Sequence, residues 1–329
     1  MSSIGEGGTG LGEVRARNAL QAAGLDPHVP LERASSVTNE VWLTAGHAVR
    51  VNRRRDRRLA REAIIAASLP AVIGYPEIVA KAKGPGEDWL VSKRRPGWPL
   101  AHRWPTLTVD QRRSAIGQVA ARLAAVHSTA PPAGLPPIDD APQLLATDPA
   151  GMVIAGLRDA ARMEGVDRMF LHDAIELVQD IGPALQPFTS ETLIHGDLTF
   201  ENILWDDGIT ALLDVEWSRP GPPDLDLDII LRCCAYPHLH VAERHVAATR
   251  AVDYADVPAW LAEDYPALFD VPLLLDRLRL YAIAYEVRAL LDAPPLTRAG
   301  DLPPLHPYNR LAMVVRGESH LDTSLPRLL

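Results

Sequence analysis

Short runs of alternating apolar and polar residues fill the first part of the chain, together with one stretch of helical spacing. Alternation predicts strands with one buried face, whereas apolar residues three or four positions apart predict a helix. The order is strand, strand, helix, strand, strand, which predicts an α+β unit built on an antiparallel sheet. The strands are expected at Val37–Thr44, His47–Asn52, Glu77–Ala82 and Trp89–Ser92, and the helix at Asp56–Leu69.

Beyond Arg94-Arg95-Pro96-Gly97 the pattern changes to helical spacing. The clearest stretch is Val109–His127, whose apolar residues share one helix face. A compact strand-rich segment, Leu193–Val215, interrupts the helices. Further helices are expected at Glu13–Ala23, Val153–Met163, Asp167–Ile181 and about residues 224–236, 257–265, 270–292 and 307–316.

These patterns predict two lobes. We expect residues 1–93 to form a small antiparallel-sheet lobe with a helix, in which the Gly-rich residues 1–12 are disordered. Residues 94–98 are the expected hinge, and residues 99–329 the larger, mainly helical lobe. The predicted fold class is therefore α+β and bilobal, with candidate catalytic residues in the loop 193–217 of the second lobe.

Composition excludes several classes of protein. The chain has 329 residues, of which 47 % are hydrophobic and 23 % charged, so it is neither disordered nor a coiled coil. No apolar run is long enough for a membrane span, and no secretory signal is visible at the N-terminus. The two cysteines, Cys233 and Cys234, are adjacent, so neither a disulfide nor a zinc framework is expected. We expect a cytoplasmic protein.

The charge distribution indicates a bound anion. The formal net charge of −9 argues against nucleic acid and anionic membranes as partners. The segment from Thr44 to Arg95 nevertheless contains twelve basic and five acidic residues. A basic segment in an acidic protein fits either an anion-binding site or a solvated basic face. The oligomeric state cannot be read from these patterns.

The strand-rich segment carries the candidate chemistry. Two apolar strands bracket a polar loop that presents Asp197 and, five residues later, Asn202. The second strand ends at Asp214. Carboxylate and amide oxygens are hard ligands that suit Mg²⁺, and a separate carboxylate can accept a hydroxyl proton. A base, an amide ligand and a metal-binding carboxylate in this order are typical of kinases.

His195-Gly196-Asp197, followed by Asn202 and Asp214, resembles the aminoglycoside phosphotransferase and choline kinase superfamily. These are small-molecule kinases with a protein-kinase-like fold. The segment from Gly221 to Leu227 matches the family's next motif. The resemblance implies ATP or GTP and Mg²⁺ as cofactors. It also implies Asp197 as the catalytic base, Asn202 and Asp214 as metal ligands, and His195 and Asp226 as structural residues.

The resemblance extends more thinly to the first lobe. The family's phosphate anchor is usually a lysine, but the corresponding strand here offers Arg50, with Arg53 as its rival. Glu62 matches the helix carboxylate that pairs with the anchor. The expected phosphate loop contains no glycine, so Ser35 and Ser36 are either phosphate donors or part of a plain turn. The nucleotide-binding candidates are Arg50, Glu62, Ser36, Lys93 and Arg95.

The acceptor is less defined. Glu216, Glu263 and Asp264 are candidate acceptor ligands, which would suit a cationic substrate; Glu216 could instead reach a second metal. Aromatic residues of the same helical region, such as Trp260 and Tyr285, could instead line a pocket for a sugar or nucleoside. We favour an antibiotic phosphotransferase. The alternatives are a metabolic kinase for choline, homoserine or a sugar, and a non-catalytic nucleotide-binding module.

Overall fold

The computed structural model describes residues 7–34, 36, 39–52, 56–82, 87–136, 138, 148–188, 191–295, 297 and 299–325. The chain forms two compact units, and neither is a single continuous segment. The first comprises Met1–Ile138, Thr199–Ser218 and His238–Thr249, and the second comprises Asp139–Leu198, Arg219–Pro237 and Arg250–Leu329. No helix within the described ranges is both long and apolar enough to cross a membrane.

The first unit contains the predicted antiparallel sheet, with the strand order β1-β2-β3-β5-β4. In its centre, Val41 of β2 faces Arg50 of β3, which faces Leu90 of β5. The four strands expected from alternation are confirmed, and only the three-residue β1 is additional. The strands are β1 (Glu32–Ala34), β2 (Asn39–Leu43), β3 (His47–Asn52), β4 (Ile78–Lys81) and β5 (Trp89–Lys93).

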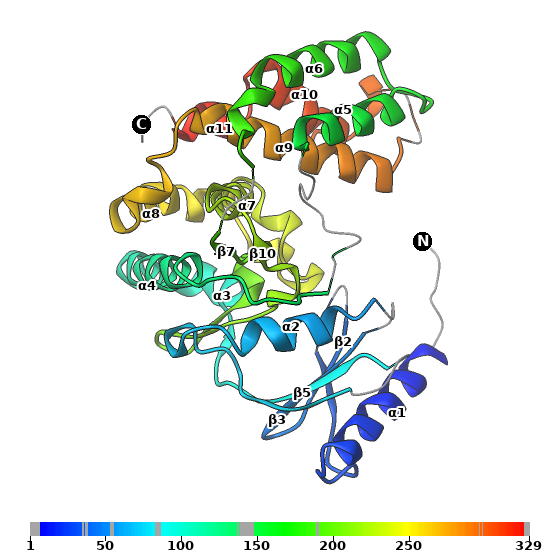
Figure 1. Ribbon diagram of the computed structural model, residues 1–329, viewed down its shortest axis with the longest axis vertical. Coiled ribbons are helices and arrows are strands. Elements are labelled where there is room, and N and C mark those ends of the chain that lie inside the picture. The colour runs from blue at the N-terminus through cyan, green and yellow to red at the C-terminus, as the bar shows by residue number, and fades with distance from the viewer. Residues whose placement is uncertain are drawn as a thin grey trace. The chain divides into compact units, whose positions relative to one another are not determined.

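Two helices, α1 (Gly7–Ala22) and α2 (Arg58–Ala66), cover opposite faces of this sheet (Figure 1). Val49 and Val51 pack against α1, so the side chain of Arg50 between them points to the α2 face. Strand alternation therefore places a basic side chain beside α2. The start of α1 differs from the prediction, because residues 7–12 extend the helix that was expected from Glu13.

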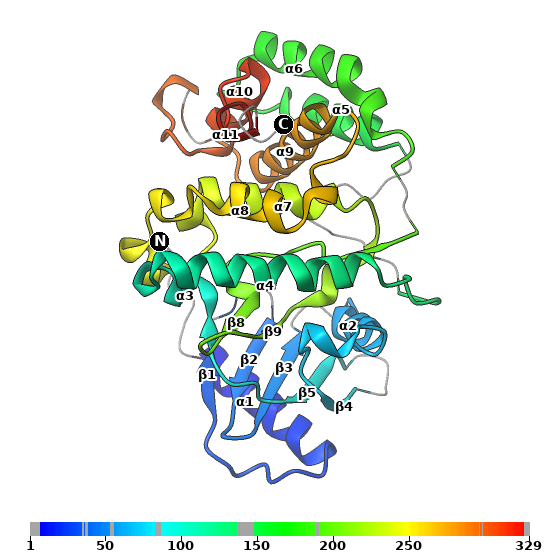
Figure 2. The ribbon, with the colours of Figure 1, turned by 90° about the vertical axis from the view of Figure 1, so that its left-hand side faces the viewer.

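The rest of the first unit supports a three-stranded sheet with the order β6-β8-β9. The long helix α4 (Val109–His127) runs beside it (Figure 2). Gln118 and Arg122 of α4 hydrogen-bond the backbone of Ile209 at distances of 2.9 and 2.7 Å, which ties α4 to β9. The elements are β6 (Trp98–Pro99), α3 (Leu100–Arg103), β8 (Ile203–Trp205) and β9 (Ile209–Leu212).

The residues that lead into β6 pack closely on β8 and β9 of the three-stranded sheet. Gly97 has φ +106°, and a Cβ there would lie 2.6 Å from the carbonyl oxygen of Trp205, so only glycine fits. Arg95 donates to the carbonyl of Thr210 at 2.8 Å, and the Thr210 hydroxyl donates to the carbonyl of Pro96 at 2.7 Å. The assignment of residues 94–98 as a hinge stays a prediction.

The second unit is mainly helical, as the periodicity predicts. Helix α9 (Leu274–Asp292) packs against α5, α7 and α10. A buried ion pair between Arg277 of α9 and Asp224 of α7, with an Nε–Oδ2 distance of 2.7 Å, joins these two helices. The other elements are α5 (Pro149–Ala160), α6 (Arg168–Ile181), β7 (Leu193–Ile194), β10 (Arg219–Pro220), α7 (Asp224–Ala235), α8 (Val257–Asp264), α10 (Pro307–Arg316) and α11 (His320–Ser324).

One buried histidine of the second unit predicts an acid-sensitive stability. Both ring nitrogens of His320 are buried without a hydrogen-bond partner among the described residues. Burial and the charge of Arg232 lower the pKa of His320 to about 3. Because the unfolded chain binds this proton more readily, the free energy of unfolding should be highest above pH ~6.5 and fall as the pH drops towards 3, by at most about 1.4 kcal/mol per pH unit.

The variant His320→Phe tests this expectation, since phenylalanine keeps an edge-to-face contact with Tyr236 and cannot be protonated. Urea denaturation between pH 7 and 4 should show a shallower loss of stability in the variant than in the wild type. Equal slopes for the two proteins would contradict the assignment.

Candidate active site

Arg50 lies at the centre of a buried cluster of carboxylates in the first unit. Its Nη1 forms an ion pair with Glu62 of α2. Its Nη2 lies 2.7 Å from Asp214 Oδ1 and 3.3 Å from Glu216 Oε2. Tyr75 also donates its hydroxyl to Glu62, at 2.5 Å. One guanidinium thus binds three carboxylates. Glu62 lies 12 positions after Arg50 in the sequence, whereas Asp214 and Glu216 lie 164 and 166 positions after it.

Two arginines face the three carboxylates of this cluster, since Arg58 also pairs with Glu216, at 3.1 Å. Although burial alone lowers it, Asp214, Glu62 and Glu216 raise the pKa of Arg50 well above its usual value. Burial, together with the charge of Asp214, raises the pKa of Glu62 and Glu216. Oxygen atoms of the three carboxylates lie within 4.8 Å of one another. Of these three, Glu62 and Glu216 are fully buried and paired with arginines, whereas the Asp214 side chain is 24 % exposed, so Asp214 is the member that could reach a bound Mg²⁺.

Asn202 and Asp214 are brought together by the β8–β9 hairpin. Ile203 pairs with Leu212, and the N–H of Leu213 donates to the carbonyl of Asn202 at 2.8 Å. The backbone of Asp214 is left-handed, with φ 61° and ψ 55°. This conformation ends the strand and turns the chain into the 3-10 turn Val215–Trp217. The two predicted metal ligands therefore flank one ladder.

Glu216 is held on all sides and offers no surface to an acceptor. Its side chain has 0 % relative exposure. Besides Arg50, it accepts from Asn39 Nδ2 at 2.8 Å and from Arg58 Nη1 at 3.1 Å. A carboxylate that is enclosed by three donors cannot also bind a substrate cation. The interpretation of Glu216 as an acceptor ligand is therefore corrected: it anchors the turn after Asp214.

The start of the predicted catalytic loop, residues 193–198, belongs to the second unit and is braced by Asp226 of α7. The Asp226 carboxylate accepts the backbone N–H groups of His195 and Gly196 at 2.7 and 2.8 Å. The N–H of Asp197 donates to His195 Nδ1 at 3.3 Å. His195 is completely buried, whereas Asp197 is half-buried. These hydrogen bonds fix the backbone that carries Asp197.

The remaining candidates lie at the surface. Ser36 donates its hydroxyl to the carbonyl of Asn39. Lys93 forms an exposed ion pair with Glu77, with an Nζ–Oε2 distance of 2.6 Å. Glu263 and Asp264 are exposed at the end of α8. Ser35 and Arg53 lie outside the described residues. The nucleotide roles of Ser36, Lys93 and Arg95 stay predictions.

Sequence reasoning missed three residues of the cluster, namely Asn39, Arg58 and Tyr75. Each is polar and reaches Glu62 or Glu216 through its side chain. Arg58 belongs to a run of basic residues, and the sequence does not show which of these arginines faces the protein interior. In the structure Arg58 is buried, at 6 % relative exposure, whereas Arg57 beside it is exposed.

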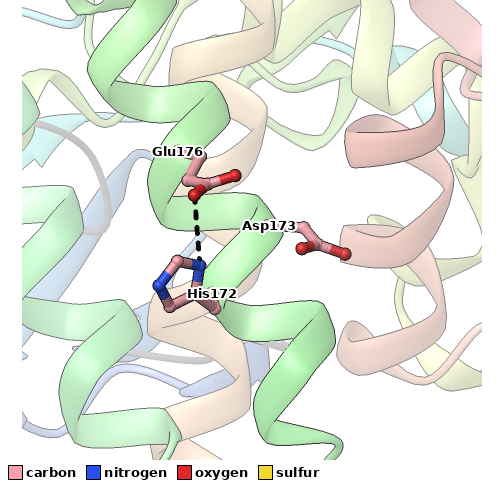
Figure 3. A group of neighbouring side chains, drawn as sticks. All are labelled: His172, Asp173 and Glu176. Atoms are coloured by element: carbon pink, nitrogen blue, oxygen red, sulfur yellow. Dashed lines mark ion pairs between the residues drawn. The ribbon is translucent and has the colours of Figure 1, made fainter.

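A second group of possible metal ligands lies on α6 and carries no comparable site. His172 Nδ1 is 3.5 Å from Glu176 Oε1, and both side chains are exposed. A carboxylate oxygen of Asp173 lies within 4.8 Å of both ligand atoms, and Figure 3 marks an ion pair between His172 and Glu176 alone. An exposed pair one helical turn apart is typical of a solvated helix face.

The comparison with known families identifies the family to which the chain belongs. The family model described as "Phosphotransferase enzyme family" (APH) matches residues 31–291. The chain belongs to this phosphotransferase family. It is accordingly a small-molecule kinase that carries out nucleotide-dependent phosphotransfer, which confirms the predicted family and enzyme class. No curated protein matches the sequence significantly.

Solved phosphotransferases share the fold. The GDP complex of aminoglycoside 2'-phosphotransferase-IIIa superimposes with a TM-score of 0.62 at 15 % identity, over 94 % of this chain and 99 % of that one. The ADP-bound aminoglycoside phosphotransferase APH(2'')-Ib gives 0.61 at 13 % identity, over 88 % and 94 %. Macrolide 2'-phosphotransferase type I gives 0.56 at 17 % identity, over 97 % and 99 %. The predicted protein-kinase-like α+β fold is confirmed.

Proposed function

We propose that this phosphotransferase moves the γ-phosphoryl group of ATP or GTP to a hydroxyl of an antibiotic or similar natural product. The observation that carries the kinase chemistry is the buried Arg50–Glu62 ion pair beside Asp214. A cation held by a helix carboxylate is what a kinase needs to neutralise phosphate oxygens. The planar arginine fork can bind two such oxygens in parallel, whereas the ammonium of a lysine acts as a compact point charge.

The other residues take roles that fit their positions. Asn202 and Asp214 would hold Mg²⁺, which neutralises charge on the phosphates when it is bound. Asp197 orients the acceptor hydroxyl and accepts its proton late in the transfer, while Asp226 keeps the loop of Asp197 in place. Positioning and charge stabilisation contribute most of the rate, since the transition state is loose.

The choice of an antibiotic as acceptor rests on the structural relatives. They include an aminoglycoside phosphotransferase in a ternary complex with ADP and hygromycin B, one in a complex with GDP and kanamycin, and a macrolide phosphotransferase. Identity to each is low, so the acceptor class is inferred from the shared fold and needs a direct assay.

Resistance in a sensitive bacterial host tests the acceptor. We expect expression of the chain to raise the inhibitory concentration of at least one aminoglycoside, macrolide or nucleoside antibiotic, and the Asp197→Ala variant to abolish the effect. Purified enzyme with ATP and GTP, in a coupled assay over the same panel, should identify the phosphorylated compound. Transfer to choline, homoserine or a sugar, with no antibiotic phosphorylated, would replace this acceptor by a metabolic one.

A polycationic acceptor predicts a specific kinetic change. Neutralising both exposed carboxylates, with Glu263→Gln and Asp264→Asn, should raise the acceptor KM by roughly tenfold, or about 1.4 kcal/mol. The kcat should change little, because such contacts bind ground and transition states alike. The nucleotide KM should not change. Steady-state kinetics check this.

The matched control alters the same charge elsewhere on the second unit, with Asp180→Asn and Glu318→Gln, both exposed. This control should leave every constant near its wild-type value. An unchanged acceptor KM in the Glu263 and Asp264 variant would exclude the polycation and favour a nucleoside or sugar-like antibiotic.

A further inference from the structure

Two arginines of helix α2 contact the turn that follows Asp214. Near the start of the helix, Arg58 donates from Nη1 to Glu216 Oε1 at 3.1 Å, and its guanidinium lies 4.8 Å from the ring centroid of Trp217. One turn later, Arg61 donates from Nη2 to the carbonyl of Ser218. The segment after the metal-binding aspartate is therefore docked on the helix that carries Glu62.

This docking matters because the backbone of Asp214 is left-handed, with φ 61° and ψ 55°. Aspartate adopts this conformation more readily than most non-glycine residues, but it still depends on the surroundings to hold it. Two residues later, the Glu216 side chain connects the chain to β2 through Asn39 and to α2 through Arg58. These contacts restrain the turn that follows Asp214.

Arg58 is itself fixed. Its Nε lies 2.9 Å from Asp56 Oδ2, and Asp56 also accepts from Asn52 Nδ2 at 2.5 Å. The side chain is 6 % exposed. Its contacts with the carboxylate cluster and the following turn are those with Glu216 and Trp217, so it acts on Asp214 through these two residues. A rigid, doubly paired arginine is suited to hold a loop in register.

We propose that Arg58 is a positioning residue, which holds Asp214 in its metal-binding orientation through Glu216 and Trp217. The inference rests on the proposed role of Asp214 in Mg²⁺-nucleotide binding. Arg50 Nη2 is shared between Asp214 and Glu216. Without Arg58, Glu216 is left with Asn39 and Arg50, and it competes with Asp214 for the same guanidinium nitrogen. Asp214 then loses its restraint, although its carboxylate is intact.

The test compares Arg58→Gln and Arg58→Lys with a control arginine of the same unit. Arg112 also lies over a tryptophan, 5.6 Å from the Trp104 centroid, and donates to the carbonyl of Trp104 at 3.0 Å, but it belongs to α4 and not to α2 or the turn after Asp214. Arg112→Gln therefore removes a similar stacking contact without touching the turn. The Tm of each variant shows how much of any effect is loss of folding.

The first readout is binding of a fluorescent ATP analogue as a function of Mg²⁺ concentration, which needs no acceptor. Arg58→Gln should raise the Mg²⁺ concentration for half-maximal binding by roughly tenfold, which corresponds to about 1.4 kcal/mol. Arg58→Lys should recover part of this, because it restores the charge but not the fork. Arg112→Gln should lower the Tm without altering the Mg²⁺ dependence.

The second readout is hydrogen exchange of the peptide that spans residues 213–218, measured without metal or nucleotide. Exchange there should accelerate in Arg58→Gln and stay at the wild-type rate in Arg112→Gln. An unchanged Mg²⁺ dependence together with unchanged exchange would overturn the positioning role. If the wild type itself binds the nucleotide analogue without any Mg²⁺ dependence, the proposed metal site fails instead, and the exchange result alone decides whether Arg58 orders the turn.

Discussion

Replacing Asp197 by alanine is expected to lower kcat by at least about 10²-fold, which is the lower end of what general acid–base groups contribute. The nucleotide should still bind, because the Arg50 cluster is untouched. Stability should change little, since Asp197 is half-buried and the loop backbone is held by Asp226. Coupled-assay kinetics, together with fluorescent-nucleotide binding, check both halves of the expectation.

Asp197→Asn is the matched control for this experiment. The amide has the same shape and can still contact the acceptor hydroxyl, but it cannot accept a proton as a carboxylate does. A loss as large as that of the alanine variant assigns the effect to proton acceptance. Turnover near the wild-type value in either variant would remove Asp197 from the mechanism.

Replacing Arg50 by alanine should both destabilise the first unit and abolish transfer. Without the guanidinium, the buried Glu62 carboxylate keeps the hydrogen bond from the Tyr75 hydroxyl but loses its ion pair. The neighbouring carboxylates of Asp214 and Glu216 also repel each other. Removing one partner of a buried ion pair costs about 3–5 kcal/mol. Urea denaturation should show a loss of this order, the coupled assay should show no transfer, and binding of a fluorescent nucleotide should weaken.

The double variant Arg50→Met with Glu62→Met separates the two effects. Replacing a buried ion pair by apolar side chains of similar volume is often neutral for stability. The double variant should therefore regain much of the lost stability while remaining inactive. Recovery of activity along with stability would show that the pair serves folding alone.

Local signals explain which parts of the fold could be predicted. Helix α4 begins and ends where its periodicity does, because Thr108 and Gln111 form a capping box at its N-terminus. The β2–β3 hairpin follows from alternation around Ala45-Gly46. The predicted helix at Glu13 begins six residues after the observed start of α1 at Gly7. Glycines are poor helix formers, and the packing of α1 on the sheet cannot be read from the sequence.

The candidate site divides in the same way. His195, Asp197, Asn202 and Asp214 lie within one short segment, so their spacing is visible in the sequence. The contacts of Arg58 and Asn39 with Glu216 join residues 158 and 177 positions apart. Such pairs leave no periodic pattern, because each partner is placed by a different element. Only the folded chain shows that they meet.

The proposed role of Arg50 as the phosphate anchor affects how this kinase can be labelled chemically. Amine-reactive nucleotide analogues attach to kinases through a lysine next to the phosphates, and the whole sequence contains only Lys81, Lys83 and Lys93. Lys93 is occupied by Glu77 at the surface, and Arg50 cannot be acylated while its guanidinium stays protonated. Dicarbonyl reagents also need a neutral guanidine nitrogen, so the raised pKa of Arg50 should protect it from them, and a covalent label for this site has to be directed to another group.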